Sequence, residues 1–427
     1  MRVKRKNRLA RMDDAHGTNA LLAAAFFVVV CGISVLALNP STNKEVDLAS
    51  WLPWLFGITV IAAFVQFVLV HVKPRPNLLL FPLAMMAVAV GIVMIARLNP
   101  PLLTAQLRWL LIGMGVLLVM LRLNRRLGRL PGNYQYIWGL LCLLVLATAI
   151  LFGTEIGGSR NWIVLGSFRV QPSEFGKLLL VLFLASFLAD HRAMLKESAQ
   201  RRFPPLRFIA PLIVIWSMAI LMFVIQRDLG SALLFFGLAV TMTYMATRNK
   251  AYVAAAFAFF IPMAGVSYLL FSHVQRRFDI WLDPWQDPTG AAYQIVQSLF
   301  AFAAGGVWGR GLGDGAPLLI PEAHTDFIYA AVAEELGLIG ALTLLVIYAA
   351  FFYEGIKIAL ASDNDGKVLL AAGIATTFFL QAFIIIAGVS KFLPLTGITL
   401  PFISYGGSSM VSSFAMLGIL LALSRRK

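Results

Sequence analysis

Long apolar runs with few charges constrain this chain more than any other feature of its sequence. Each run is close to the length that an α-helix needs to cross the hydrocarbon core of a bilayer, roughly 20 residues. Transmembrane β-strands would be about half as long and would alternate in polarity, and that pattern is missing. The runs therefore predict an all-α polytopic membrane protein with about 12 transmembrane helices. They fall at about 19–39, 50–71, 77–97, 105–121, 135–153, 175–190, 208–225, 229–246, 251–271, 327–352, 368–389 and 400–423.

The composition agrees with this class. Hydrophobic residues make up 60% of the 427 residues and charged residues 13%, whereas soluble domains average about 45–50% and about 25%. The same figures exclude a disordered chain. The net charge of +15 is explained first by cytoplasmic loops rich in Lys and Arg, so we expect no nucleic-acid partner.

The distribution of positive charge predicts the orientation. Most of the 35 Lys and Arg residues lie in one set of alternate connections, which includes both ends of the chain. The positive-inside rule places that set, and hence both termini, in the cytoplasm. The first run follows a basic stretch without a small-residue cleavage site after it, and is interpreted as a retained signal anchor. Segments 154–174 and 272–326 then fall on the outer side, where the larger loop is the main candidate for chemistry.

The outer loop 272–326 contains a doubled Asp-Pro pattern, DPWQDP, with Asp283 and Asp287. Each proline fixes its own φ and disfavours the helical region for the preceding residue. An aspartate in such an extended turn can be aimed at a substrate, or it can simply start a turn, and the motif alone leaves both open. The candidate side chains in this loop are Arg276, Arg277, Asp283, Asp287, Tyr293, Gln297, His324 and Asp326.

Two further stretches of the loop region have two readings each. The Gly-rich segment 303–315 could bind an anion through backbone N–H groups or form a flexible re-entrant loop. In the helix that follows, Asp326, Tyr329, Ala333 and Gly337 share one face, and Glu334 lies beside it. Carboxylates at membrane depth usually face a polar cavity or a partner, and a salt-bridge network with His324 and nearby arginines is the alternative.

Polar residues also interrupt three other apolar regions. In QPSEFGK, Glu174 and Lys177 are three residues apart on one helix face and form either a latch or a cavity wall. Asp228 in QRDLGSA is a candidate helix cap. The segment PFISYGGSS, with Ser404 and Ser408, starts the last run, where irregular backbone is tolerated only if it is buried or lines a cavity.

The cysteines and histidines, the residue types that often bind metals, form no metal-binding pattern in this sequence. Cys31 and Cys142 lie in apolar runs and are expected to be small buried hydrophobes rather than a disulfide. The five histidines form no spaced cluster, so a histidine-rich metal site is not expected.

Five ordered blocks give the chain a resemblance to a known family. They are SRNWIVLGSFRVQPSEFGKLLLVLFLA, QRDLGSALL, RRFDIWLDPWQDPTGAAYQIVQSLFAFAAGGVWGRGLG, IPEAHTDFIYAAVAEELGLIG and LPLTGITLPFISYGGSS. Over about residues 80–424 the chain resembles the SEDS (shape, elongation, division and sporulation) family. The resemblance implies a SEDS-like glycosyltransferase core at 76–427. Residues 1–75 then form a basic cytoplasmic N-terminus plus an extra transmembrane hairpin of unassigned role.

The resemblance also implies an activity. Members of the family are peptidoglycan glycosyltransferases that polymerise lipid II at the outer face of the bacterial cytoplasmic membrane, releasing undecaprenyl pyrophosphate. They usually work with a class B penicillin-binding protein, the transpeptidase, and other divisome or elongasome membrane proteins are further expected partners. The family's essential outer-loop aspartate falls on Asp287, the expected general base. A divalent cation, Mg²⁺ or Mn²⁺, is a candidate cofactor.

The same comparison of blocks assigns two cavity residues, and the other candidates come from the polar residues of the loops. Glu174 and Lys177 match residues that line the family's central cavity. The expected substrate-binding residues are Glu174, Lys177, Arg276, Arg277, Asp283, Tyr293, Gln297, His324, Asp326, Ser404 and Ser408. The expected supporting residues are Arg160, Trp162, Asp228, Glu334 and Glu335.

Two departures and two alternatives stay open. Arg227 replaces the usual proline of the QPDLGTA block, and Lys391 is gained near the outer surface, which leaves a division, elongation or sporulation role undecided. The alternative function is a lipid II flippase or lipid-linked sugar transporter, which should show gates on both faces. A third reading is a non-catalytic scaffold, which would tolerate loss of Asp287.

Overall fold

The computed structural model describes residues 2–42, 46–123, 134–156, 158–166, 168–197 and 206–425. Within these ranges ten helices are long and apolar enough to cross a membrane, and two shorter apolar helices cover Ala210–Gln226 and Gly407–Leu423. Together they account for the twelve predicted runs, and the helical polytopic fold is confirmed. Parts of the basic connections used for orientation, 124–133 and 198–205, lie outside the described residues.

The chain forms two compact units, each assembled from segments that are distant in sequence. Unit 1 comprises Met1–Asn124, Phe300–Glu354 and Thr399–Lys427, and unit 2 comprises Arg125–Leu299 and Gly355–Ile398. The predicted division near residue 75 concerns the extent of a family core rather than packing, and it stays a prediction.

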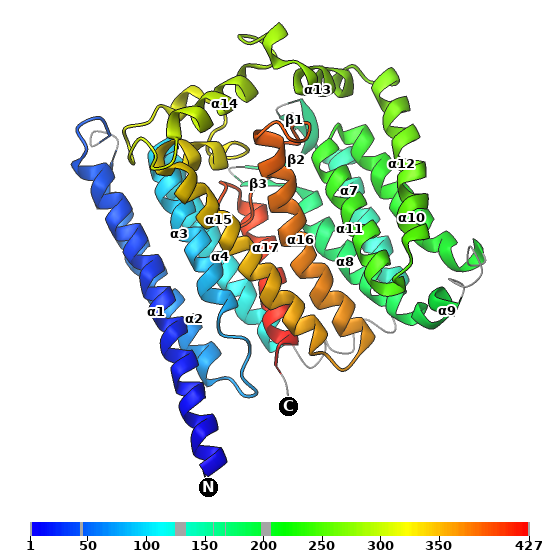
Figure 1. Ribbon diagram of the computed structural model, residues 1–427, viewed down its shortest axis with the longest axis horizontal. Coiled ribbons are helices and arrows are strands. Elements are labelled where there is room, and N and C mark those ends of the chain that lie inside the picture. The colour runs from blue at the N-terminus through cyan, green and yellow to red at the C-terminus, as the bar shows by residue number, and fades with distance from the viewer. Residues whose placement is uncertain are drawn as a thin grey trace. The chain divides into compact units, whose positions relative to one another are not determined.

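Unit 1 is built around two well-buried helices, Leu80–Leu98 and Gly407–Leu423. Its elements are α1 (Arg2–Leu38), α2 (Leu48–His71), α3 (Leu80–Leu98), α4 (Pro100–Arg122), η4 (Pro317–Leu319), the first part of α15 (Ile328–Leu360) and α17 (Gly407–Leu423). Helix α1 packs on α3, α2 on α4, and α4 on α17 (Figure 1). Glycine permits a close approach of α4 and α17, since a Cβ on Gly113 would lie 2.9 Å from the ring of Phe414.

Unit 2 surrounds α8, which is buried against its neighbours. Its elements are α7 (Gln135–Phe152), β1 (Thr154–Ile156), β2 (Ser159–Leu165), β3 (Phe168–Val170), α8 (Pro172–Asp190), α9 (Arg192–Glu197), α10 (Leu206–Gln226), α11 (Leu229–Thr247), α12 (Lys250–Leu270), α13 (Ser272–Leu282), η3 (Pro284–Gln286), the start of α14 (Tyr293–Gly305) and α16 (Asp365–Val389). Helix α8 packs on α7, α11 and α16 (Figure 1).

A small antiparallel sheet, which the sequence analysis did not anticipate, follows α7. The strands lie in the order β1-β2-β3, with Thr154 opposite Trp162 and Ile163 opposite Val170. Gly158 and Gly166 have positive φ values of 78° and 62° at the two reversals of the chain. Glycine adopts this conformation at little cost, which explains how such short strands can turn.

The helix after the loop 272–326 differs from its prediction at its start and at one interior position. It begins at Ile328, so Asp326 lies in the preceding turn rather than on the helix. Gly337 has φ 67° and ψ −167° and interrupts the helix. The predicted face from Asp326 through Tyr329 to Gly337 is therefore wrong, because the 3.6-residue period applies only where the backbone is helical.

Candidate functional site

The doubled Asp-Pro pattern forms a tight, exposed turn in unit 2. Asp283 precedes η3 and Asp287 follows it, with φ values of −140° and −139°. Both aspartates are thus outside the helical region, as the following prolines require. The Oδ1 atom of Asp283 accepts a hydrogen bond from Trp285 N at 3.1 Å, so this residue caps the short helix. The turn-starting interpretation is therefore correct for Asp283.

Asp287 is held by the next turn of the chain. Its Oδ2 accepts a hydrogen bond from Ala291 N at 2.7 Å, and its backbone carbonyl accepts from Ala292 N at 3.2 Å. A Cβ on Gly290 would lie 2.4 Å from both carboxylate oxygens, so only glycine leaves room for this arrangement. The side chain remains exposed to solvent. The turn therefore presents a fixed carboxylate to an incoming hydroxyl group.

Helix α13 places two arginines just before this turn. Arg277 donates from Nη1 to the carbonyls of Leu395 and Thr396, each at 3.1 Å. Trp281 donates to the carbonyl of Lys391 at 3.2 Å, so α13 is anchored along residues 391–396. Arg276 is exposed. The predicted pair is therefore divided, with Arg277 in an anchoring position and Arg276 on the surface.

Tyr293 and Gln297 lie on the first turns of α14, four residues apart and hence on one face. Both are half-buried. On another side of this helix, Ser298 is buried and donates to the carbonyl of Val389 at 2.9 Å. This contact fixes the start of α14 against the end of α16.

Glu174 and Lys177 form a buried ion pair in the first turns of α8. Lys177 Nζ lies 2.5 Å from Glu174 Oε2 and donates to Gln381 Oε1 at 2.8 Å. The exposed fractions of Lys177 and Glu174 are only 1% and 6%. A buried pair needs such additional hydrogen bonds to offset desolvation. Gln381 on α16 was not among the predicted site residues, although a polar residue within an apolar run was the available signal.

Residues of the small sheet are connected to the start of α11. Asn161 donates from Nδ2 to Asp228 Oδ2 at 2.8 Å, and Asp228 Oδ1 accepts from Ser231 N at 3.0 Å. Asp228 therefore caps α11, as predicted, and also holds β2. Arg160 donates to the carbonyl of Gly153 at 2.9 Å, and the carbonyl of Trp162 accepts from Thr154. These contacts give the supporting residues of this block a structural role.

In unit 1, His324 lies against the segment that precedes α17. Its carbonyl accepts from Tyr405 N at 2.9 Å, and Ser404 Oγ donates to the carbonyl of Thr325 at 2.6 Å. Burial lowers the pKa of His324, and the nearby Glu322 carboxylate partly opposes that shift. His324 and Ser404 are thus brought together through backbone contacts, with the half-buried Asp326 next along the chain.

The segment around Ser404 is itself fixed from α4. Gln106 donates to the carbonyl of Ser404 and accepts from Gly406 N, both at 3.2 Å. Ser408 is buried in the first turn of α17. The non-helical backbone here is therefore buried in protein, as the bilayer requires.

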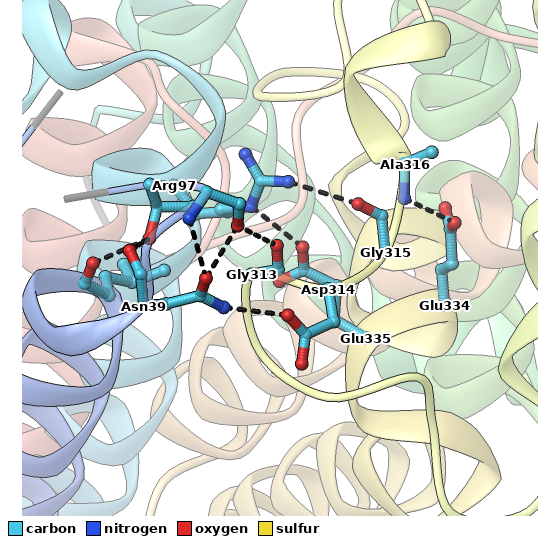
Figure 2. Close-up of polar contacts among 11 residues, drawn as sticks. Asn39, Arg97, Gly313, Asp314, Gly315, Ala316, Glu334 and Glu335 are labelled. Carbon is cyan, nitrogen blue, oxygen red and sulfur yellow. Dashed lines mark hydrogen bonds and ion pairs between the residues drawn. The ribbon is translucent and has the colours of Figure 1, made fainter. Parts of the chain in front are cut away.

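Another buried ion pair lies in unit 1, and one of its members, Arg97, was not among the predicted site residues. Arg97 Nε lies 3.0 Å from Glu335 Oε1, with side-chain exposures of 7% and 0% (Figure 2). Arg97 also donates to the carbonyl of Gly315 at 3.2 Å, and Glu334 Oε1 accepts from Ala316 N at 2.8 Å. The two glutamates therefore bind the end of the Gly-rich loop. An arginine at the end of an apolar run was the available signal.

The described residues give a limited fit to a metal ion. Within them, no group of three or more His, Cys, Asp or Glu side chains is arranged to hold one. Mg²⁺ is often bound through one or two carboxylates plus substrate phosphates. Asp283 and Asp287 in one exposed turn are the residues that could contribute to such a site once a pyrophosphate is bound.

Comparison with known proteins identifies the family. A family model described as "Cell cycle protein" for FtsW, RodA and SpoVE matches residues 76–427. Peptidoglycan glycosyltransferase RodA of Mycobacterium tuberculosis is 35% identical over 426 residues, covering 95% of this chain and 89% of that protein. Stage V sporulation protein E of Bacillus subtilis is 33% identical over 368 residues, covering 83% of this chain and 98% of the relative.

A solved structure supports the same assignment. A chain from a study of the structural coordination of polymerization and crosslinking by a peptidoglycan synthase complex superposes with a TM-score of 0.67 and 29% identity. The match covers 81% of this chain and 96% of that one. The chain therefore belongs to the FtsW, RodA and SpoVE family, the SEDS family that its sequence resembles. It is a multi-pass membrane protein.

Proposed function

We propose that this protein is a peptidoglycan glycosyltransferase that polymerises lipid II into β-1,4-linked glycan strands. The observation that carries the proposal is the turn at 283–291, which holds the Asp287 carboxylate fixed and exposed. The relatives named peptidoglycan glycosyltransferases support it, since they cover most of this chain. A flippase receives no comparable support from the described contacts.

In the proposed reaction Asp287 is the general base. It takes the proton from the 4-hydroxyl of the acceptor GlcNAc, and that oxygen attacks the anomeric carbon of the donor MurNAc. The bond to undecaprenyl pyrophosphate breaks, and its electron pair leaves with the pyrophosphate. A single displacement inverts the α-linked donor to a β-1,4 bond. General base catalysis typically supplies about 10²–10⁴-fold, so positioning and charge stabilisation supply the remainder.

Positive charge is needed where the pyrophosphate leaves. Arg276 is the leading candidate, because it is exposed on α13, the helix that leads directly into the aspartate turn. Arg277 and Lys177 are less free to move, since each is already bonded to neighbouring groups. A divalent cation bound with the pyrophosphate would supply further positive charge.

The proposal includes an orientation and a partner. The positive-inside bias supports an outer-face reaction with both termini in the cytoplasm. The similar structure comes from a study of polymerization coordinated with crosslinking. We therefore propose a class B penicillin-binding protein as the partner that adds the peptide cross-links.

The test is a glycan polymerisation assay with purified protein, labelled lipid II and the cognate partner. Asp287→Asn and Asp287→Ala should each lower the rate by about 10²–10⁴-fold, because the proton acceptor is lost. Asp283→Asn is the matched comparison, since an asparagine also caps η3, and it should lower the rate less than either Asp287 variant because the proposed proton acceptor is kept. Normal polymerisation by both Asp287 variants would exclude this residue as the base and direct attention to Asp283.

A further inference from the structure

The N-terminal hairpin, α1 and α2, lies outside the part of the chain that the family model matches, which begins at residue 76. It is nevertheless packed tightly on the rest of unit 1. A Cβ on Gly32 of α1 would lie 2.6 Å from the Val93 side chain of α3. The Mycobacterium tuberculosis relative covers 95% of the chain, more than residues 76–427 supply, so the relative shares sequence with this hairpin.

The tip of the hairpin makes polar contacts with the Gly-rich outer loop, residues 306–316. Asn39 donates from Nδ2 to Asp314 Oδ1 at 2.8 Å, and the Ser41 hydroxyl lies within hydrogen-bond distance of both Asn39 Oδ1, at 2.7 Å, and the carbonyl of Gly313, at 3.1 Å (Figure 2). Asn39 is held in place for this contact, since its Oδ1 accepts from Ser41 N at 2.9 Å. Thr42 is buried and closes the end of α1 by donating to the carbonyl of Leu36 at 2.6 Å.

The Gly-rich loop depends on such contacts for its conformation. Gly306, Gly309, Gly311 and Gly313 all have positive φ, and glycine loses more conformational freedom on folding than any other residue. On its inner side the loop is held by Arg97 and Glu334. On the side that faces the hairpin, the Asn39–Asp314 hydrogen bond holds the residue directly before Gly315. The end of the loop therefore lies between the buried charges of Arg97, Glu334 and Glu335 on one side and Asn39 of the hairpin on the other (Figure 2).

The hairpin faces the same outer segment at a second place. A cavity of about 730 Å³ is lined by Asp47 and Trp51 of the hairpin, by Asn99 and Thr104 near the start of α4, and by Leu318. Leu318 belongs to η4, directly after the Gly-rich loop. The hairpin therefore borders both the loop and the short helix that follows it.

We propose that the N-terminal hairpin positions the Gly-rich outer loop for glycan polymerisation, with Asn39 and Asp314 as the positioning pair. The loop leads into the segment with His324, which belongs to the same unit. Its order therefore sets the position of this predicted substrate-binding residue. The effect on catalysis rests on the proposed function, whereas the effect on loop order does not.

The test exchanges the two side chains in the full-length protein. Asn39→Asp alone places two carboxylates against each other, and Asp314→Asn in addition restores an amide–carboxylate pair with donor and acceptor reversed. The single variant should raise KM for lipid II about three- to tenfold, the range that one hydrogen bond supports, with a smaller change in kcat. The double variant should return KM to near the wild-type value.

A second readout needs no substrate. Amide hydrogen exchange at residues 306–316 should accelerate in Asn39→Asp and recover in the double variant. Asn249→Asp is the matched control, because Asn249 caps α12 by accepting from Ala251 N and aspartate caps equally well; it should change neither readout. Unchanged exchange in Asn39→Asp, or a defect that the second substitution does not relieve, would overturn the inference. Exchange that responds in a protein without polymerase activity would refute only the proposed function.

Discussion

At the scale of single residues, the site depends on what each side chain already contacts. Asp283 and Asp287 are both exposed, and each accepts a hydrogen bond from a backbone N–H group, which caps η3 at Asp283 and fixes the turn after Asp287. Arg277 anchors α13 to 395–396. Residues of one type in one motif thus differ in their availability to substrate. The hydrogen bonds determine which of them can take part in chemistry.

Gly290 offers a sharp test of this reasoning. In Gly290→Ala the new Cβ would lie 2.4 Å from both oxygens of Asp287, so the carboxylate must rotate out of its position. We expect at least a tenfold loss of polymerisation, because small displacements of a catalytic group can cost about 10²-fold. The turn is on the surface, so the melting temperature should change little. The lipid II assay and thermal unfolding in detergent measure the two effects, and full activity would contradict the assigned position of the base.

At the scale of elements, backbone hydrogen bonds join α15 to the Gly-rich loop. The backbone N–H of Arg310 donates to the carbonyl of Glu334 at 2.9 Å, and Leu338 N donates to the carbonyl of Gly306 at 2.9 Å. The interruption of α15 at Gly337 leaves these groups free to pair with the loop. The break in the helix therefore secures the loop rather than merely bending the helix.

This interpretation predicts the effect of a single methyl group. In Gly337→Ala the residue keeps a left-handed φ of 67° and its Cβ would meet Gly309 N at 2.3 Å. We expect a loss of about 2 kcal/mol or more in the free energy of unfolding, since such strain alone costs about 1–3 kcal/mol.

The matched control is Gly265→Ala within α12, where a Cβ meets nothing within 4 Å. That change should be neutral or stabilising, because alanine favours the helix. Thermal unfolding of both variants in detergent decides between them, and equal stabilities would show that the interruption is not a tight contact.

At the scale of the whole molecule, the proposed function requires the loop 272–326 to face away from the cytoplasm. Asp287 can act on lipid-linked saccharides at the outer face only if the aspartate turn lies on that face of the membrane. The orientation rests on positive charge, and five of the arginines that contribute to it lie in connections 124–133 and 198–205, outside the described residues. It can be measured directly.

Single cysteines provide that measurement. Trp308 is 81% exposed in the Gly-rich loop, and the Asp363 side chain is 85% exposed in the turn before α16. In intact cells with a permeabilised outer envelope, Trp308→Cys should react with a membrane-impermeant maleimide and Asp363→Cys should not. In inverted vesicles the result should reverse. The wild-type chain, with its partly buried Cys31 and buried Cys142, is the background control, and the opposite pattern would exclude an outer-face reaction.

Local chemistry explains what could be predicted from the sequence. Each apolar run had to become a helix, because a bilayer leaves no other way to satisfy the backbone of a single segment. The prolines placed Asp283 and Asp287 outside the helical region through steric effects on adjacent residues. The cap at Asp228 likewise needed only its near neighbours.

Tertiary packing decided the rest. Gln381 lies 204 positions from Lys177 along the chain, and Arg97 lies 238 positions from Glu335; no periodicity predicts such partners. The start of α15 and its break at Gly337 follow from the loop that pairs with it, a contact between distant backbone groups. Sequence thus determined which segments are helical and which turns are rigid. Only the folded chain decided which buried charges neutralise each other, because desolvation and pairing depend on neighbours supplied by other segments.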